Sequence, residues 1–121
     1  MTNLLLYNLP KEKEETLASI ARGLQLSYRV ILPEAFGESI GKLCGAPAHE
    51  SDKAATGLPF ADEMLVLCGL AEPQLDLLLF ALRTAKIPVR LKAVLTEQNI
   101  GWSGFALRAA LAEEDAYLRR Q

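Results

Sequence analysis

Short apolar runs alternate with longer amphipathic stretches along this chain, and the alternation predicts strands and helices in turn. Residues 4–7 and 64–68 are continuously apolar, which is typical of strands covered on both faces of a sheet. Residues 28–32 are mixed in polarity and predict a strand with one face partly in water. In the segment 89–95 two kinds of position alternate, with Val89, Leu91, Ala93 and Leu95 on one side and Arg90 and Lys92 on the other. This alternation predicts an edge strand.

Four helical segments are interleaved with these strands. The first follows Pro10 and carries one apolar face, formed by Leu17, Ile20, Ala21 and Leu24. A shorter helix is predicted from Pro33 toward Leu43, and a last one contains Trp102, Phe105, Leu107, Leu111 and Leu118. The helix predicted for 73–85 is apolar around most of its circumference, which favours burial on more than one side or contact with another subunit.

The order of elements predicts a single α/β domain over residues 1–121. The connection between the strands at 64–68 and 89–95 exceeds a dozen residues and reads as helical, as a parallel crossover requires. We therefore predict a four-stranded, mainly parallel sheet of order 2-1-3-4 with helices on both faces. In this order a ligand is expected outside the carboxyl ends of the first and third strands. Residues 46–59 have no periodic pattern and contain Gly57, Pro47 and Pro59, so we expect a mobile loop there.

Charge and composition exclude several classes of partner. The formal net charge of −2 gives no electrostatic footprint for nucleic acid. No apolar run approaches the length of a membrane span, and the amino terminus lacks the positive start of a secretion signal, so a cytoplasmic location is expected. The two cysteines, Cys44 and Cys68, are then expected to be reduced.

Five residues lie near the expected ligand edge of the sheet, and they form the candidate binding site: Asn8, Cys68, Thr96, Asn99 and Trp102. An anionic metabolite or a nucleotide is the kind of ligand that this edge would hold. Each residue also has a structural interpretation. Cys68 can be an inert core group, Thr96 or Asn99 can cap the last helix, and Trp102 can cover the end of the sheet.

Other chemical motifs are incomplete. A structural zinc site needs four ligands, usually in two closely spaced pairs. The chain offers only Cys44 and His49, with Glu50 or Asp52, which is not enough for such a site. The segment 37–43 is one residue shorter than a phosphate-binding loop and has Leu43 where Ser or Thr would hold magnesium. We therefore predict no catalytic residue, metal or cofactor.

Glycines recur every fourth residue at Gly37, Gly41 and Gly45. On a helix this spacing makes a bare strip, which favours close backbone packing or an interface.

The sequence resembles the bacterial family known as domain of unknown function 3783. The resemblance lies in three blocks, LLLYNL at 4–9, EMLVLCGL at 63–70 and LKAVLT at 91–96, and in the two later residues Asn99 and Trp102. Where that family often has proline after the threonine, this chain has Glu97. The resemblance implies a small bacterial cytoplasmic protein without an assigned activity.

Two functions are compatible with these patterns. The first is a non-enzymatic binding or protein-interaction domain that self-associates through the helix at 74–85 or the glycine strip, because apolar helix surface is in excess. The alternative is a small-molecule binding protein or weak enzyme that uses the five candidate residues. The sequence leaves open whether catalysis occurs, and it favours a partner protein or a small molecule over a membrane or nucleic acid.

Overall fold

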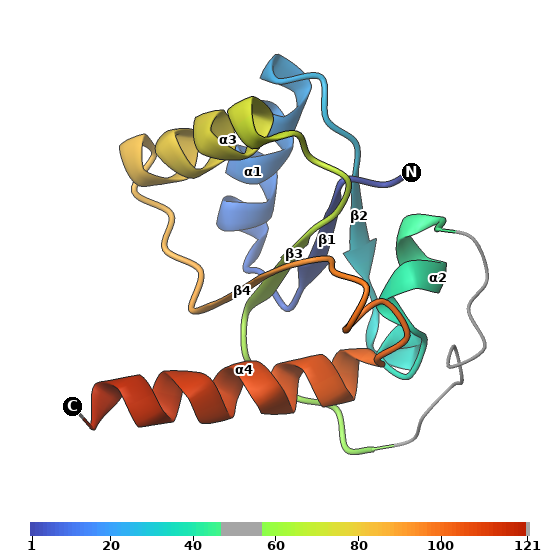
Figure 1. Cartoon of the computed structure of the whole chain (residues 1–121). Helices are drawn as coiled ribbons and strands as arrows, with labels where there is room; N and C mark the ends of the chain where they lie inside the picture. Colours follow the sequence, from blue (N-terminus) through green and yellow to red (C-terminus); the bar gives the residue numbers. More distant parts are fainter. Residues whose placement is uncertain (47–56, 121) are drawn as a thin grey trace.

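The computed structural model describes residues 1–46 and 57–120, which form a four-stranded sheet with helices on both faces (Figure 1). The strands are β1 (Leu4–Tyr7), β2 (Tyr28–Ile31), β3 (Met64–Leu67) and β4 (Leu91–Val94). The helices are α1 (Lys11–Gly23), α2 (Ile40–Cys44), α3 (Glu72–Thr84) and α4 (Gly104–Arg119), with a 3₁₀ turn, η1, at Pro33–Ala35. The strand order β2-β1-β3-β4 confirms the sequence-based prediction.

The centre of the sheet is antiparallel, while both outer pairs are parallel. β1 runs parallel to β2 and β3 runs parallel to β4. Between the two pairs, Leu4 lies opposite Leu67 and Tyr7 lies opposite Met64. The carboxyl ends of β1 and β3 therefore lie at opposite ends of the sheet, and the expectation that they meet at one ligand edge is wrong.

Both central strands are buried on both faces, as their continuous apolar runs predict. Leu4, Leu6, Leu65 and Leu67 pack against α1 and α3, which lie side by side on one face of the sheet. Leu5, Tyr7, Met64 and Val66 pack against α2 and α4 on the other face. The chain thus has two apolar cores, one on each side of β1 and β3. Figure 1 shows the two helix layers that cover them.

The two halves of the sheet repeat the same β-α-β-α arrangement around an approximate two-fold axis between β1 and β3. Equivalent residues occupy equivalent places: Leu17 and Ala21 of α1 are buried as Leu78 and Leu82 of α3 are. After each helix one residue is left-handed, Gln25 at φ 60° and Lys86 at φ 56°. The next amide then donates back into the helix, Leu26 to Ala21 O at 2.8 Å and Ile87 to Leu82 O at 3.2 Å. This pattern is the Schellman end of a helix.

The short helices meet where the two halves face each other. Ser39 and Ser103 form an isolated antiparallel bridge, and each hydroxyl caps its helix by accepting from the amide three residues on. Gly41 N–H donates to Ile100 O at 2.8 Å, and a Cβ on Gly41 would lie 2.7 Å from Ile100 Cγ1 and 2.9 Å from its carbonyl oxygen. Gly104, the first residue of α4, makes a similar approach, since a Cβ there would lie 2.8 Å from Phe36 O. Glycine is required here because the backbones approach too closely for a side chain.

Several local predictions need correction. The helix expected from Pro33 is split into η1 and α2, because Ser39 caps a new helix start. The three glycines do not form a continuous strip on one helix, since α2 begins at Ile40 and Gly45 ends it at φ 84°. At Gly41 the close backbone packing that the spacing favours is present, against Ile100. The cap of the last helix is Ser103 rather than Thr96 or Asn99.

The fourth strand begins later than the sequence pattern predicts. Val89 packs into the core under α1 and α3, whereas Leu91, Ala93 and Leu95 face the other core. Val89 is therefore not on the same side as these residues, and β4 starts at Leu91. Of the loop predicted at 46–59, residues 47–56 lie outside the described part of the chain.

We expect Gly41→Ala to destabilise the fold by about 1–3 kcal/mol, because the new methyl group overpacks the contact with Ile100. Gly23→Ala is the matched control, because nothing lies within 4 Å of a Cβ at that helical position. The control should be neutral or more stable by up to about 1 kcal/mol. Urea unfolding of the two variants measures both effects. Equal stabilities would contradict the close approach at Gly41.

Candidate functional site

The five residues predicted to bind a ligand do not surround one site. Asn8 follows β1, at the end of the sheet where β3 begins. Its side-chain nitrogen donates to Phe60 O at 2.7 Å and to Asp62 O at 3.1 Å. Asn8 thus holds the segment that leads into β3 against the end of β1. Its backbone is left-handed, at φ 60°, a conformation that asparagine adopts more readily than most residues.

Thr96 and Asn99 build the turn that ends β4. Thr96 N–H donates to Asn99 Oδ1 at 2.9 Å, and Asn99 N–H donates to Thr96 Oγ1 at 3.2 Å. Asn99 Nδ2 donates to Val94 O at 3.1 Å, so the amide has partners on both of its polar atoms. Trp102 packs at the margin of the core on the α4 side, and its carbonyl accepts from Ile40 N–H at 2.8 Å. The polar groups of this turn hold the backbone together.

Cys68 is completely buried, next to Cys44 and Tyr7 in the core on the α2 and α4 side. Burial, and then the neighbouring Cys44 thiol, raise the pKa of Cys68 far above its usual value. Burial is also the main cause that raises the pKa of Tyr7. A thiol with a raised pKa and no exposure is a poor nucleophile. The burial and the raised pKa of Cys68 are consistent with its interpretation as an inert core residue.

A metal site is not formed by the described residues. Among residues 1–46 and 57–120, no group of three His, Cys, Asp or Glu side chains is placed to hold an ion. His49, Glu50 and Asp52, which the sequence pairs with Cys44, lie outside the described residues. No helix in the described part of the chain is long and apolar enough to cross a membrane.

The structural feature that sequence reasoning left without a function is the open edge of β4. Leu91 N–H donates to Glu63 O and Leu95 N–H donates to Leu67 O, so the alternate residues of β4 turn their peptide groups toward β3. The peptide groups of Lys92 and Val94 therefore point away from the sheet. Val94 O accepts from Asn99 Nδ2, and among the described residues the other outward groups have no partner. The alternating pattern of 89–95 correctly predicts this edge.

A groove lies on each side of the β4 edge. On the α3 side a groove of about 520 Å³, here called the α3 groove, has an apolar floor of Leu79, Leu82, Ile87 and Pro88. Three cations complete its lining: Arg83, Lys86 and Lys92. On the α4 side a shallower groove of about 170 Å³, here called the α4 groove, contains Leu91, Leu111 and Leu118 together with Arg90, Lys92, Glu114 and Asp115. Lys92 lines both grooves, since it stands at the edge between them.

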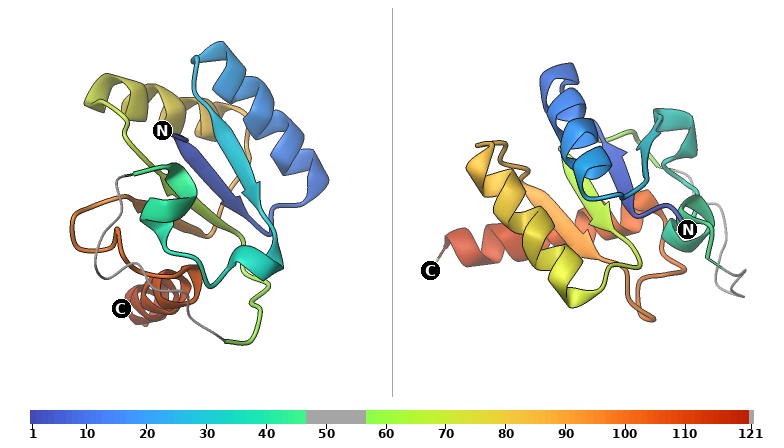
Figure 2. Two further views of the ribbon diagram at one scale, coloured as in Figure 1. Left: turned by 90° about the vertical axis from the view of Figure 1, so that its right-hand side faces the viewer. Right: turned by 90° about the horizontal axis from the view of Figure 1, so that it is seen from above.

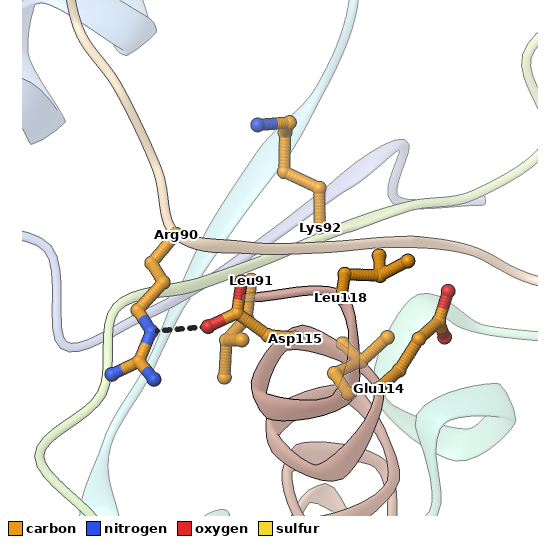
Figure 3. Close-up of a pocket in the computed structure, with 7 residues that line it drawn as sticks. Arg90, Leu91, Lys92, Glu114, Asp115 and Leu118 are labelled. Atoms are coloured by element: carbon orange, nitrogen blue, oxygen red, sulfur yellow. Dashed lines mark hydrogen bonds and ion pairs between the residues drawn. The ribbon is translucent and has the colours of Figure 1, made fainter. Parts of the chain in front are cut away.

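The carboxyl-terminal part of α4 continues past β4, as Figure 1 and the right-hand view of Figure 2 show. Figure 3 shows that Leu91 points toward α4 and that Lys92 points to the opposite side of the strand. Leu118 is 60 % exposed on this overhang. The β4 edge therefore borders a slot that has α3 above it and the end of α4 below it.

Ion pairs fix α4 beneath the strand. Arg90 Nε donates to Asp115 Oδ2 at 2.9 Å (Figure 3). Arg119 Nε lies 3.0 Å from the same oxygen. Asp62 joins Arg90, at 3.7 Å, to Arg108, at 2.9 Å. The hydrogen bond from Arg90 is the main cause that lowers the pKa of Asp115. This network positions the α4 side of the slot.

The fold and the slot define a class: a small α/β protein made of two β-α-β-α halves, with an open sheet edge beside two helices. Residues 63–118 match the model of the domain of unknown function family DUF3783. The match confirms the sequence resemblance, and it covers the second half of the sheet with β3, α3, β4 and α4. No curated protein and no solved structure matches the chain.

The buried thiol predicts how stability depends on pH. Because the pKa of Cys68 is higher in the folded protein than in the unfolded chain, its stabilising effect is complete below about pH 8.5 and is lost as pH rises above that value. We expect a loss of up to about 1.4 kcal/mol per pH unit from this group, and a shallower slope in Cys68→Ala. Urea unfolding between pH 7 and 10.5 under reducing conditions, followed by the fluorescence of the single tryptophan, measures the slope. The same slope in both proteins would contradict the buried thiol.

Proposed function

We propose that the chain is a non-enzymatic protein-interaction domain of the bacterial cytoplasm, and that its binding surface is the slot along β4. The observation that carries the proposal is the row of outward peptide groups on β4 between the α3 groove and the α4 groove. An open strand edge can add a strand from another chain, with main-chain hydrogen bonds for affinity and flanking grooves for side chains. An edge left open without such a role favours aggregation.

The two grooves strengthen this proposal over a small-molecule function. A ligand site built from the five candidate residues would need Asn8 close to Cys68, and the antiparallel centre of the sheet separates them. The side chain of Asn8 binds two carbonyls of the segment before β3, and those of Thr96 and Asn99 bind backbone groups of their own turn or of the end of β4. The β4 edge, in contrast, combines outward backbone groups, unpaired among residues 1–46 and 57–120, with apolar surface on both sides.

We expect Val94→Pro to weaken the binding of strand-forming peptides about tenfold or more, because proline removes an outward N–H that the added strand needs. Val94 is 47 % exposed on an edge strand, where proline is tolerated. Peptides selected from a random library on the wild-type protein provide the probe, and fluorescence anisotropy gives the dissociation constants.

Val30→Pro is the matched control, since Val30 occupies the equivalent place on β2, the opposite edge of the sheet. It should leave binding unchanged. If peptides bind both proline variants as well as the wild type, the β4 edge is not the binding surface. If only Val30→Pro weakens binding, the surface is β2.

A second candidate is self-association through the outward face of α3. The helix buries Leu78 and Leu82 against the sheet and leaves Leu77 53 % and Phe80 61 % exposed, one turn apart. Exposed apolar patches on helices commonly mark contacts between copies of a chain. This observation supports the sequence-based expectation for the helix at 74–85.

If α3 mediates self-association, Phe80→Ser should convert an oligomer to a monomer in sedimentation velocity at high protein concentration, because the patch loses its largest apolar side chain. Tyr117→Ser is the control, because Tyr117 is a similarly exposed aromatic residue on α4. A wild-type protein that sediments as a monomer at millimolar concentration would remove this candidate.

A further inference from the structure

We propose that the slot along β4 takes an extended acidic segment of a partner protein, whose side chains alternate between carboxylates and apolar groups. This inference rests on the proposed function and adds the chemistry of the partner. In a strand, successive side chains point to opposite faces of the sheet. A strand added beside β4 would therefore send every second side chain into the α3 groove and the others onto the α4 groove.

The α3 groove selects for negative charge. Arg83, Lys86 and Lys92 line it, and its lining contains no carboxylate among the described residues. None of these three cations takes part in an ion pair within the described part of the chain. Lys92 Nζ donates to Val89 O at 2.9 Å, which keeps the ammonium at the edge of the strand. Three cations over an apolar floor complement carboxylates on short stems.

The α4 groove selects for apolar side chains. Leu118 lies on the overhang of α4, Leu111 lies further back on the same helix at the margin of the core, and Leu91 from β4 closes the floor of the groove. Of the two acids of this groove, Asp115 is bound by Arg90 and Arg119. Glu114 makes no ion pair among the described residues, and its charge disfavours a partner carboxylate on this side. A partner residue on this side would cover leucine side chains, which favours β-branched residues such as valine.

A second copy of this chain fits the slot less well. An antiparallel pair of β4 strands keeps the α3 face of both copies on the same side of the joined sheet. The cations of the two α3 grooves would then lie together, with the Lys92 of each copy near the other strand. Like charges opposed across a strand pair destabilise it. An acidic partner removes this repulsion and pairs every cation.

The test uses three synthetic peptides on the full chain: a fluorescein-labelled (Glu-Val)₄ peptide and its (Gln-Val)₄ and (Lys-Val)₄ counterparts. We expect the glutamate peptide to bind about tenfold tighter than the glutamine peptide, with affinity that falls as salt rises, and the lysine peptide not to bind. The triple variant Arg83→Gln, Lys86→Gln, Lys92→Gln should lose this preference. The control triple variant Lys11→Gln, Arg22→Gln, Lys42→Gln removes the same charge from exposed positions outside both grooves and should keep it.

The outcomes separate the partner chemistry from the proposed function. Equal binding of the glutamate and glutamine peptides, lost in Val94→Pro, would overturn the acidic preference and leave strand addition intact. Equal loss of the preference in both triple variants would show a net-charge effect and overturn the role of the α3 groove. No binding of the glutamate peptide at 1 mM would overturn the acidic partner. The peptides selected on the wild-type protein, compared between wild type and Val94→Pro, would still decide whether the edge binds any strand. Unchanged binding in Val94→Pro would overturn both.

Discussion

The antiparallel pairing of β1 with β3 is the constraint on which the rest of the structure depends. Both strands are apolar on both faces, so each needs a neighbour along its edges and a helix layer above and below. Their pairing satisfies the inner edges, and it joins two β-α-β-α halves around an approximate two-fold axis. The second half alone, which is the part that matches the DUF3783 family, would leave the β3 edge and two apolar faces in water.

The two outer strands occupy equivalent positions but have different surroundings. β2 and β4 occupy equivalent edges, yet the cations and leucines of the slot belong to β4, α3 and α4. Arg83 has an equivalent in Arg22 of α1, whereas the residues equivalent to Lys86 and Lys92 in the first half are Gln25 and Tyr28, which carry no charge. The β4 edge thus has two cations at positions that are uncharged at the β2 edge, and this difference makes the β4 side the candidate surface.

Hydrogen bonding explains why the polar residues of the predicted ligand site have structural roles. Where a strand ends, the backbone N–H and C=O groups of the next few residues no longer have a partner in the sheet and need one elsewhere. Asn8 satisfies two carbonyls before β3, and Asn99 satisfies both the turn at Thr96 and the last carbonyl of β4. A polar side chain after a strand therefore predicts a turn as readily as it predicts a ligand.

The sequence by itself determined the elements, their order and the buried or exposed character of each strand, because periodic apolar patterns report how many faces of an element are covered. It also determined the edge position of β4, through the alternation of Arg90 and Lys92 with apolar residues. Only the tertiary structure decided the direction of β3 relative to β1, since an apolar run pairs equally well in either direction. That direction separates Asn8 from Cys68 and brings Arg83, Lys86 and Lys92, from a helix, a turn and a strand, into one groove. No local pattern encodes that convergence, because it depends on how the helices cross the sheet.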